Sequence, residues 1–230
     1  VGARFHFTQN ITAWFGTLRE ACARRGIPER LYCDNGKVFT SEDIRRVGFI
    51  AGFHVVNAPP YDAQAKGKIE RFLRTIRDVF LSRVEIEPVA SLDELNRRLA
   101  GWVESGYNRS QHSGIGTTPL DKWLAGSHRL RVLSEEDMDR FFLFETTRKV
   151  KKDGTISFQG KRLEVDYTLS STSVAVLYDP LDPERILIRR PDGTLERATI
   201  LDVHANNRRH RQNPKPPKGG QSHADTNLDR

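Results

Sequence analysis

Over the first 82 residues, short apolar stretches with the two-residue period of a strand alternate with longer stretches that have a helical period. The strand pattern covers residues 1–7, 29–33 and 53–58, and the helical pattern covers residues 10–26, 41–52 and 68–82. Chains with this alternation form α/β folds with right-handed crossovers and a partly parallel sheet. The first half of the chain is therefore predicted to be α/β.

Local signals mark where these helices begin and end. The first helix has an apolar stripe formed by Ile11, Trp14, Phe15, Leu18 and Cys22. Asn10 can cap its start, and Gly26 marks its end. The second helix is expected to be capped by Thr40 or Ser41 and to stop at Gly52. The third helix has a predicted buried stripe of Ile69, Phe72, Leu73, Ile76 and Phe80.

The pattern changes in the second half of the chain. A helix is predicted over residues 91–108, followed by a short helix near Pro119. From residue 141 to about 203, short alternating runs separated by turn signals predict a small all-β barrel. The rest is polar, basic and rich in proline, which predicts a disordered tail. The predicted units span residues 1–130, 141–204 and 205–230.

Charge and cysteine content narrow the classes of function. The chain has 37 Lys and Arg against 30 Asp and Glu, a net charge of +7. This balance favours an anionic partner, with nucleic acid first and a generic basic surface as the alternative. Cys22 and Cys33 form no CxxC pattern, which argues against structural zinc. Without an apolar run of about 18 residues or a signal peptide, the chain is expected to be soluble and cytoplasmic, with no membrane partner.

One carboxylate, Glu70, stands among cations in the helix at 68–82. These cations are Lys66, Lys68, Arg71, Arg74 and Arg77. Three interpretations remain open at this point. The helix face is solvated with a weak Glu70–Arg74 pair, or it binds phosphate, or Glu70 holds a metal ion beside DNA that the cations attract.

Asp34 stands at the carboxyl end of a predicted strand, where the active-site crevice of an α/β sheet usually lies. By itself the sequence Asp-Asn-Gly is most often a turn. A two-metal site for phosphoryl transfer, however, needs acidic oxygens from separate elements. Mg²⁺ suits such a site because it prefers hard oxygen ligands. Asp34 and Glu70 are separated by 35 residues, a spacing that is weak evidence on its own.

The combination of motifs is far more specific. "YCDNGKVFTS", the 35-residue spacing and "PPYDAQAKGKIERF" closely resemble the catalytic core of DDE transposases and retroviral-type integrases. "YNRSQHSGIGTTPLDKW" is similar to the end of that core in bacterial insertion-sequence transposases. The β-rich region from about residue 141 resembles the C-terminal β-barrel of phage Mu-type transposases. The resemblance covers roughly residues 1–203.

The resemblance implies a ribonuclease-H-like integrase core that lacks its first strands, followed by the small all-β barrel. It also implies cutting and joining of DNA that depends on Mg²⁺ or Mn²⁺. Asp34 matches the second catalytic and metal-binding acid, and Glu70 matches the third. The first acid is expected upstream of Val1, so the chain is predicted to be a fragment that is inactive alone. Because residues 1–7 would lack a sheet neighbour, marginal stability is also predicted.

The implied partners are the DNA of element ends and targets, further copies of the chain on DNA, and an ATPase helper. Lys66, Lys68, Arg71, Arg74 and Arg77 are predicted to position phosphates, and localisation at the bacterial nucleoid follows. The alternative is a non-enzymatic DNA-binding or assembly module of a mobile element. In the barrel, Arg189 and Arg190 offer a basic surface for DNA or protein, with a purely structural cap as the alternative.

Overall fold

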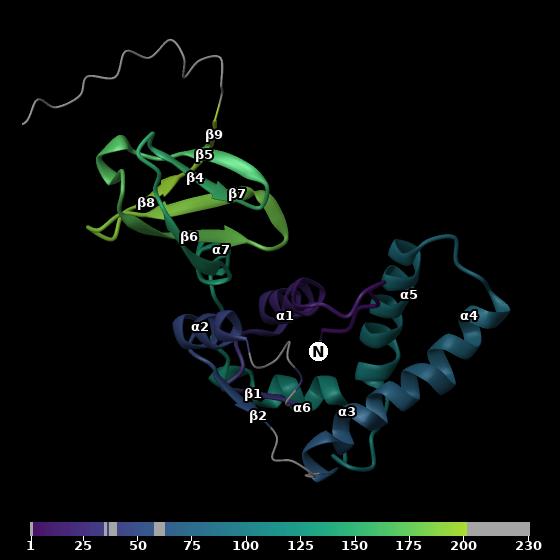
Figure 1. Ribbon diagram of the computed structural model, residues 1–230. Helices are drawn as coiled ribbons and strands as arrows, with labels where there is room; N and C mark the ends of the chain where they lie inside the picture. The colour runs from purple at the N-terminus through teal and green to yellow at the C-terminus, as the bar shows by residue number, and fades with distance from the viewer. Residues whose placement is uncertain (1, 35, 37–40, 58–62, 202–230) are drawn as a thin grey trace, which may run out of the picture.

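The computed structural model describes residues 2–34, 36, 41–57 and 63–201, with only the backbone of residues 63–66 (Figure 1). The described part combines an α/β unit with an all-β unit. The helices and strands of the first unit are α1 Ile11–Arg25, β1 Arg30–Cys33, α2 Glu42–Ala51, β2 His54–Asn57, α3 Ala63–Thr75, α4 Ser82–Ile86, α5 Leu92–Ser105, α6 Pro119–Ala125 and α7 Glu135–Phe141. No helix in the described ranges is both long enough and apolar enough to cross a membrane.

Strands β1 and β2 form a parallel pair, as the alternating pattern predicts. Their register runs from Arg30 opposite His54 to Cys33 opposite Asn57, so both strands end at the same edge. Helix α2 connects them. Its N-cap Ser41 accepts a hydrogen bond from the backbone of the first turn, and it ends at Gly52, which has the left-handed conformation that glycine favours.

Helices α1 and α2 pack on the β1–β2 pair around one apolar core. Phe15 of α1 and Ile44 and Val47 of α2 are fully buried there. Asn10 caps α1 as predicted, because its Oδ1 accepts a hydrogen bond from the backbone N–H of Ala13 at 2.8 Å. This core holds the helix that follows Asp34 in a fixed position against the strand that precedes it.

The strand predicted at residues 1–7 is wrong: residues 2–7 form no strand. The segment instead packs against α5 and the helix beyond α3. Asn96 of α5 accepts a hydrogen bond from the N–H of Phe5 at 2.7 Å and donates one to its carbonyl at 3.1 Å. The Phe5 ring stacks on Phe80, with centroids 6.3 Å apart. A side-chain amide therefore satisfies backbone groups that a neighbouring strand would otherwise pair with.

The helix predicted at 68–82 is longer and contains a change of helix type. It begins at Ala63, passes through a π-helical segment at Ile76–Leu81 and continues as α4. Phe72, Ile76 and Phe80 are buried with Leu99 and Val103 of α5 in a separate core. Ile69 and Leu73, which were predicted to be buried as well, are 51% and 52% exposed.

The C-terminal unit is all-β. Its strands are β3 Phe144–Lys149, β4 Thr155–Phe158, β5 Lys161–Glu164, β6 Ser173–Asp179, β7 Asp182–Arg189, β8 Leu195–Arg197 and β9 Thr199–Ile200. They form two antiparallel sheets, ordered β3-β6-β7-β8 and β4-β5-β9. The sheets enclose a core that includes Ile156, Leu163, Val176 and Ile188. Figure 1 shows α7 between this unit and the helices below it.

Candidate metal-binding acids and nucleic-acid interface

Asp34 directly follows β1 and is exposed at the edge where both parallel strands end. Its Oδ1 accepts a hydrogen bond from the N–H of Gly36 at 2.9 Å, which closes the turn that Asp-Asn-Gly predicts. Its backbone carbonyl accepts a hydrogen bond from Nδ2 of Asn57 at 3.0 Å. The side chain that ends β2 thus fixes the backbone that carries Asp34. The sequence pattern did not identify Asn57 as a residue that supports Asp34. The signal that could have identified it is its position as the last residue of the neighbouring strand.

A cavity of about 690 Å³ opens beside Asp34. Asp34, Gly36 and Trp14 of α1 are among the residues that line it. Ile69, Phe72 and Leu73 of α3 also line the cavity. The half-exposed residues Ile69 and Leu73 therefore line the same cavity as Asp34.

Glu70 lies between these residues in the sequence but is not among those that line the cavity. At about 100° per residue, its side chain is rotated about 100° from Ile69 and about 60° from Leu73. The carboxylate is exposed, and no ion pair joins it to Arg74 or to another described residue. The described contacts do not join Glu70 to Asp34, so the convergence of the two acids stays a prediction.

Four of the five predicted DNA-binding cations can be placed, because the side chain of Lys66 lies outside the described residues. Lys68, Arg71, Arg74 and Arg77 are all exposed. Arg71 faces the segment after α5, because a Cβ added to Gly114 would lie 3.9 Å from its Nη1. The charge of Arg71 also acts on Tyr107, whose pKa is raised above its usual value mainly by burial. The side chains of these cations therefore do not all lie on the same face of the helix as Glu70.

In the described part of the chain, no group of three or more His, Cys, Asp or Glu side chains is placed to hold a metal ion. The two predicted acids nonetheless have the hard oxygen donors that Mg²⁺ or Mn²⁺ prefers. In the described contacts, Oδ2 of Asp34 and both oxygens of Glu70 are uncommitted. The donor chemistry fits a divalent cation, and the described acids supply at most two side chains for it.

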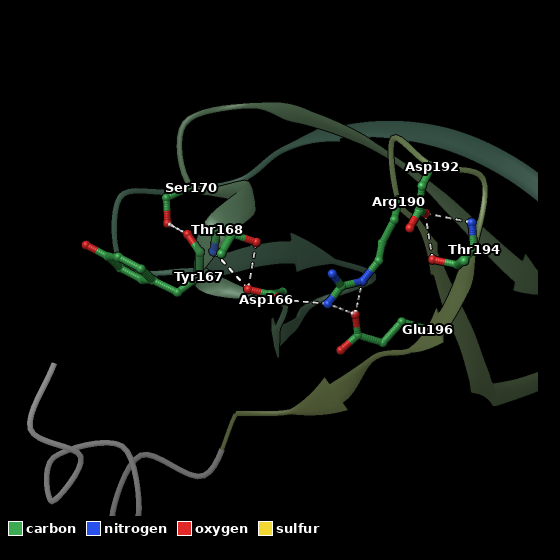
Figure 2. Close-up of polar contacts among 8 residues, drawn as sticks. All are labelled: Asp166, Tyr167, Thr168, Ser170, Arg190, Asp192, Thr194 and Glu196. Atoms are coloured by element: carbon green, nitrogen blue, oxygen red, sulfur yellow. Dashed lines mark hydrogen bonds and ion pairs between the residues drawn. The ribbon is translucent and has the colours of Figure 1, made fainter. Parts of the chain in front are cut away.

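Of the two interpretations of Arg189 and Arg190, the structure favours the structural cap, because both cations form ion pairs within the all-β unit. Arg189 pairs with Glu145 at 3.1 Å. Figure 2 shows Arg190 directed at Asp166 and Glu196, which it contacts at 2.5 Å and 2.8 Å. Hydrogen bonds from the backbone and hydroxyl of Thr168, together with Arg190, lower the pKa of Asp166 to about 2. This network stabilises the fold and leaves little free charge for DNA.

Two protein-family models match the chain. The model of the TnsB C-terminal domain matches residues 9–85, and the model of the Mu transposase C-terminal domain matches residues 139–196. The first match contains both Asp34 and Glu70, and the second coincides with most of the all-β unit. Together with the relatives below, these matches support a protein similar to DDE-type transposases and integrases.

The similar curated proteins include two bacterial transposases. The chain is 27% identical over 190 residues to the transposase for transposon Tn552 of Staphylococcus aureus, covering 77% of this chain and 39% of that protein. It is 32% identical over 149 residues to the putative transposase for insertion sequence element IS5376 of Geobacillus stearothermophilus, covering 60% and 35%. The chain thus spans less than two fifths of the length of either relative.

Among solved structures, the chain is similar to one chain in the simian T-cell lymphotropic virus intasome in complex with PP2A regulatory subunit B56 gamma. The identity is 15% and the TM-score is 0.43, and the alignment covers 84% of this chain and 66% of that one.

Proposed function

We propose that this chain forms part of a DNA transposase with a ribonuclease-H-like core, which cuts the 3′ ends of a mobile element and joins them to target DNA. The observation that carries the proposal is the placement of Asp34. It directly follows a parallel strand and lines a cavity that is also lined by residues of α3, the helix that contains Glu70, Arg71 and Arg74. The carboxyl edge of a parallel sheet is where such folds place their ligands.

The chain's own residues would bind and orient the DNA backbone. Arg74 of α3 and Arg77 of the π-helical segment that continues it are exposed about one and two turns from Glu70, so phosphates attracted to them would pass its carboxylate. Asn57 and Gly36 hold the backbone and one carboxylate oxygen of Asp34 in place. Ile69 and Leu73 would keep water from the side of the site that faces the cavity.

The chemistry would be two displacements at phosphorus. Water first attacks a phosphodiester, a P–O bond breaks, and the element's end is left with a 3′-hydroxyl. That hydroxyl then attacks a phosphate of target DNA, a new P–O bond forms, and a target 3′-oxygen leaves. Mg²⁺ or Mn²⁺ held by Asp34 and Glu70 would supply the positive charge that both displacements need at the attacking and leaving oxygens.

A third acidic ligand and a multimer on DNA complete the proposal. The third acid would come from a part of the protein outside these 230 residues, which fits the small share of each relative that the chain spans. The 230-residue chain alone is then expected to be inactive with Mg²⁺ or Mn²⁺. The protein would act at the nucleoid in the bacterial cytoplasm. The matches give no support for the ATPase helper.

The test is Glu70→Gln in the complete protein. We expect loss of both 3′-end cleavage and strand transfer, with DNA affinity nearly unchanged, because the amide keeps the shape of the side chain and removes its charge. Cleavage and joining are measured on labelled element ends in Mg²⁺ and in Mn²⁺. Glu85→Gln, an exposed acid of α4 on the same long helix, is the matched control and should retain both activities. Strand transfer by Glu70→Gln at the normal rate would defeat the role of Glu70.

A further inference from the structure

The two candidate acids are carried by two separate apolar cores. Asp34 follows β1, which packs with α1 and α2 in the core that contains Phe15. Glu70 lies on α3, whose Phe72 is buried with residues of α5 in the second core. Residues of α1 and of α3 both line the cavity beside Asp34. A metal site shared by the two acids therefore depends on contacts that hold one core against the other.

Arg25, the last residue of α1, makes such a contact. Its Nη2 donates a hydrogen bond to Oε2 of Glu104, near the end of α5, and the two side chains form an ion pair. The guanidinium of Arg25 also lies 5.2 Å from the centroid of the Trp123 ring of α6, which is a cation–π contact. The Arg25 side chain is only 22% exposed. One cation thus connects α1 to both α5 and α6.

Glu104 is held by a second donor. Nδ2 of Asn108 donates a hydrogen bond to the same oxygen, Oε2, at 3.2 Å, and Asn108 is only 4% exposed. Burial raises the pKa of Glu104, but the hydrogen bonds from Arg25 and Asn108 outweigh it, so the pKa lies below its usual value. Glu104 is therefore an ionised carboxylate at neutral pH, with its position fixed from two directions.

The segment that resembles the end of transposase cores, residues 107–123, contacts both cores. Its first residue, Tyr107, packs edge-on against Phe72 of α3, with ring centroids 4.8 Å apart. Its last residue, Trp123, contacts the guanidinium of Arg25 at the end of α1. The segment therefore connects α3 with the end of α1, the helix that leads into β1.

We infer that Arg25 and Glu104 are positioning residues that hold Asp34 and Glu70 at the separation that a shared metal site requires. We call the group that makes these contacts the inter-core brace: Arg25, Glu104, Asn108 and Trp123. These residues act through α1 and α5, because ligands from separate elements can share ions only at a fixed distance. Contacts that orient metal ligands in this way typically change metal affinity by about 10–100-fold. The inference rests on the proposed function and adds the contacts that bring its two acids together.

The first test measures the distance between the two cores in the 230-residue chain. Nitroxide labels on Arg45→Cys of α2 and Glu85→Cys of α4 report this distance by pulsed electron paramagnetic resonance. Both labelled positions are exposed, whereas the native Cys22 and Cys33 are buried. We expect Arg25→Ala to broaden the distance distribution, because the loss of the ion pair lets the cores move relative to each other.

The second test titrates Mn²⁺ alone into the complete protein and measures free Mn²⁺ by electron paramagnetic resonance, without any reaction. The ions that the wild type binds and Glu70→Gln does not bind define the shared site. We expect Arg25→Ala to raise the Kd of these ions about tenfold. Arg25→Lys should recover much of the affinity, because it keeps a cation near Glu104. Glu104→Ala should match Arg25→Ala, and the double variant should add little, because the two residues act as one pair.

The matched control is Arg24→Ala. Arg24 also lies in the last turn of α1, but it pairs with Glu20 of the same helix at 2.7 Å, so this pair does not cross between the cores. The control should keep the distance distribution and the Mn²⁺ affinity of the wild type. Circular dichroism and the melting temperature show whether each variant is folded, and Arg25→Lys provides the test if Arg25→Ala is not.

The outcomes separate this inference from the proposed function. The inference is overturned if Arg25→Ala behaves like Arg24→Ala in the distance test, or if it broadens the distances and leaves Mn²⁺ affinity unchanged. If Glu70→Gln removes no bound Mn²⁺, the proposed function itself fails. If Glu70→Gln does remove Mn²⁺ and Arg25→Ala matches the control in both tests, only the inference fails.

Discussion

Asp34 and Glu70 are held in different ways by their neighbours. The backbone and one oxygen of Asp34 are fixed by Asn57 and Gly36, so its free oxygen has a defined direction. Glu70 has no partner among the described residues, and its rotamer is free to change. A bound cation or a bound DNA backbone would therefore restrict the side chain of Glu70 more than that of Asp34.

Asp166 gives a prediction at the same scale. Its pKa is lowered from 3.8 to about 2, so the ionised form stabilises the fold at any pH above its unfolded value. We expect Asp166→Asn to lower the free energy of unfolding by about 1 kcal/mol at pH 7, which allows for the partial exposure of the group. The difference from the wild type should shrink as the pH falls from about 4 to about 2, because the wild-type carboxylate is then protonated. Urea unfolding at several pH values measures this, and a difference that does not change with pH would contradict it.

At the scale of elements, local sequence signals and tertiary contacts meet at the ends of helices. Gly52 ends α2 and has a φ of 77°. The backbone carbonyl of the preceding residue, Ala51, accepts a hydrogen bond from the side chain of Arg131. The end of α2 is therefore fixed both by a backbone conformation that glycine adopts readily and by a distant arginine.

Gly52→Ala should lower the free energy of unfolding by about 1–2 kcal/mol. The new Cβ would be strained at positive φ and would lie 2.5 Å from Nη1 and Nη2 of Arg131, which must then move. Gly101→Ala is the matched control, because Gly101 lies inside α5 with nothing within 4 Å of an added Cβ. That change should stabilise the protein by about 0.5–1 kcal/mol. Thermal unfolding of both variants gives the comparison, and equal effects would refute the argument.

At the scale of the whole molecule, the all-β unit is attached to the α/β unit by apolar and charged contacts together. Phe142 and Phe144 insert into the core formed by α1 and α2. Arg19 of α1 pairs with Asp179 of β6 at 2.8 Å and also with Asp139 of α7. Glu145 of β3 donates its N–H to Asp43 of α2 at 3.1 Å. These contacts connect the all-β unit to α2, the helix that follows the turn at Asp34.

Arg19→Ala tests the charged contacts between the two units. Asp179 is only 4% exposed, so losing its cation leaves a buried carboxylate without its charge partner, and we expect a loss of about 3 kcal/mol in the free energy of unfolding. Arg24→Ala removes an exposed partner of Glu20 on the same helix and should cost less than about 0.5 kcal/mol. Denaturant unfolding followed by tryptophan fluorescence compares the two. A similar small loss in both variants would mean that the Arg19 pair does not hold the units together.

Sequence patterns predicted most of the helices and strands because their causes are local. Asn10, Ser41 and Gly52 act at the positions predicted for them, and the strands at β1, β2, β4, β5, β6 and β7 follow apolar alternation. Helix α7 and strand β3 were missed, because a short acidic helix and a strand with mixed polarity have weak periodicity. The predicted strand at residues 1–7 failed for a different reason. A strand needs a partner, and in this chain the Asn96 side chain takes that place.

The sequence alone determined most of the helices and strands, the family resemblance and the two candidate acids, since each depends on residue type and spacing along the chain. Tertiary structure decided which charges are free. Arg189 and Arg190 form ion pairs with acids from other strands and turns, whereas no ion pair among the described residues includes Lys149, Lys151 or Lys152. It also decided that Ile69 and Leu73 face a cavity beside Asp34. Ion pairing and solvent exposure depend on residues that are far apart in the chain, so the local periodicity of the sequence does not predict them.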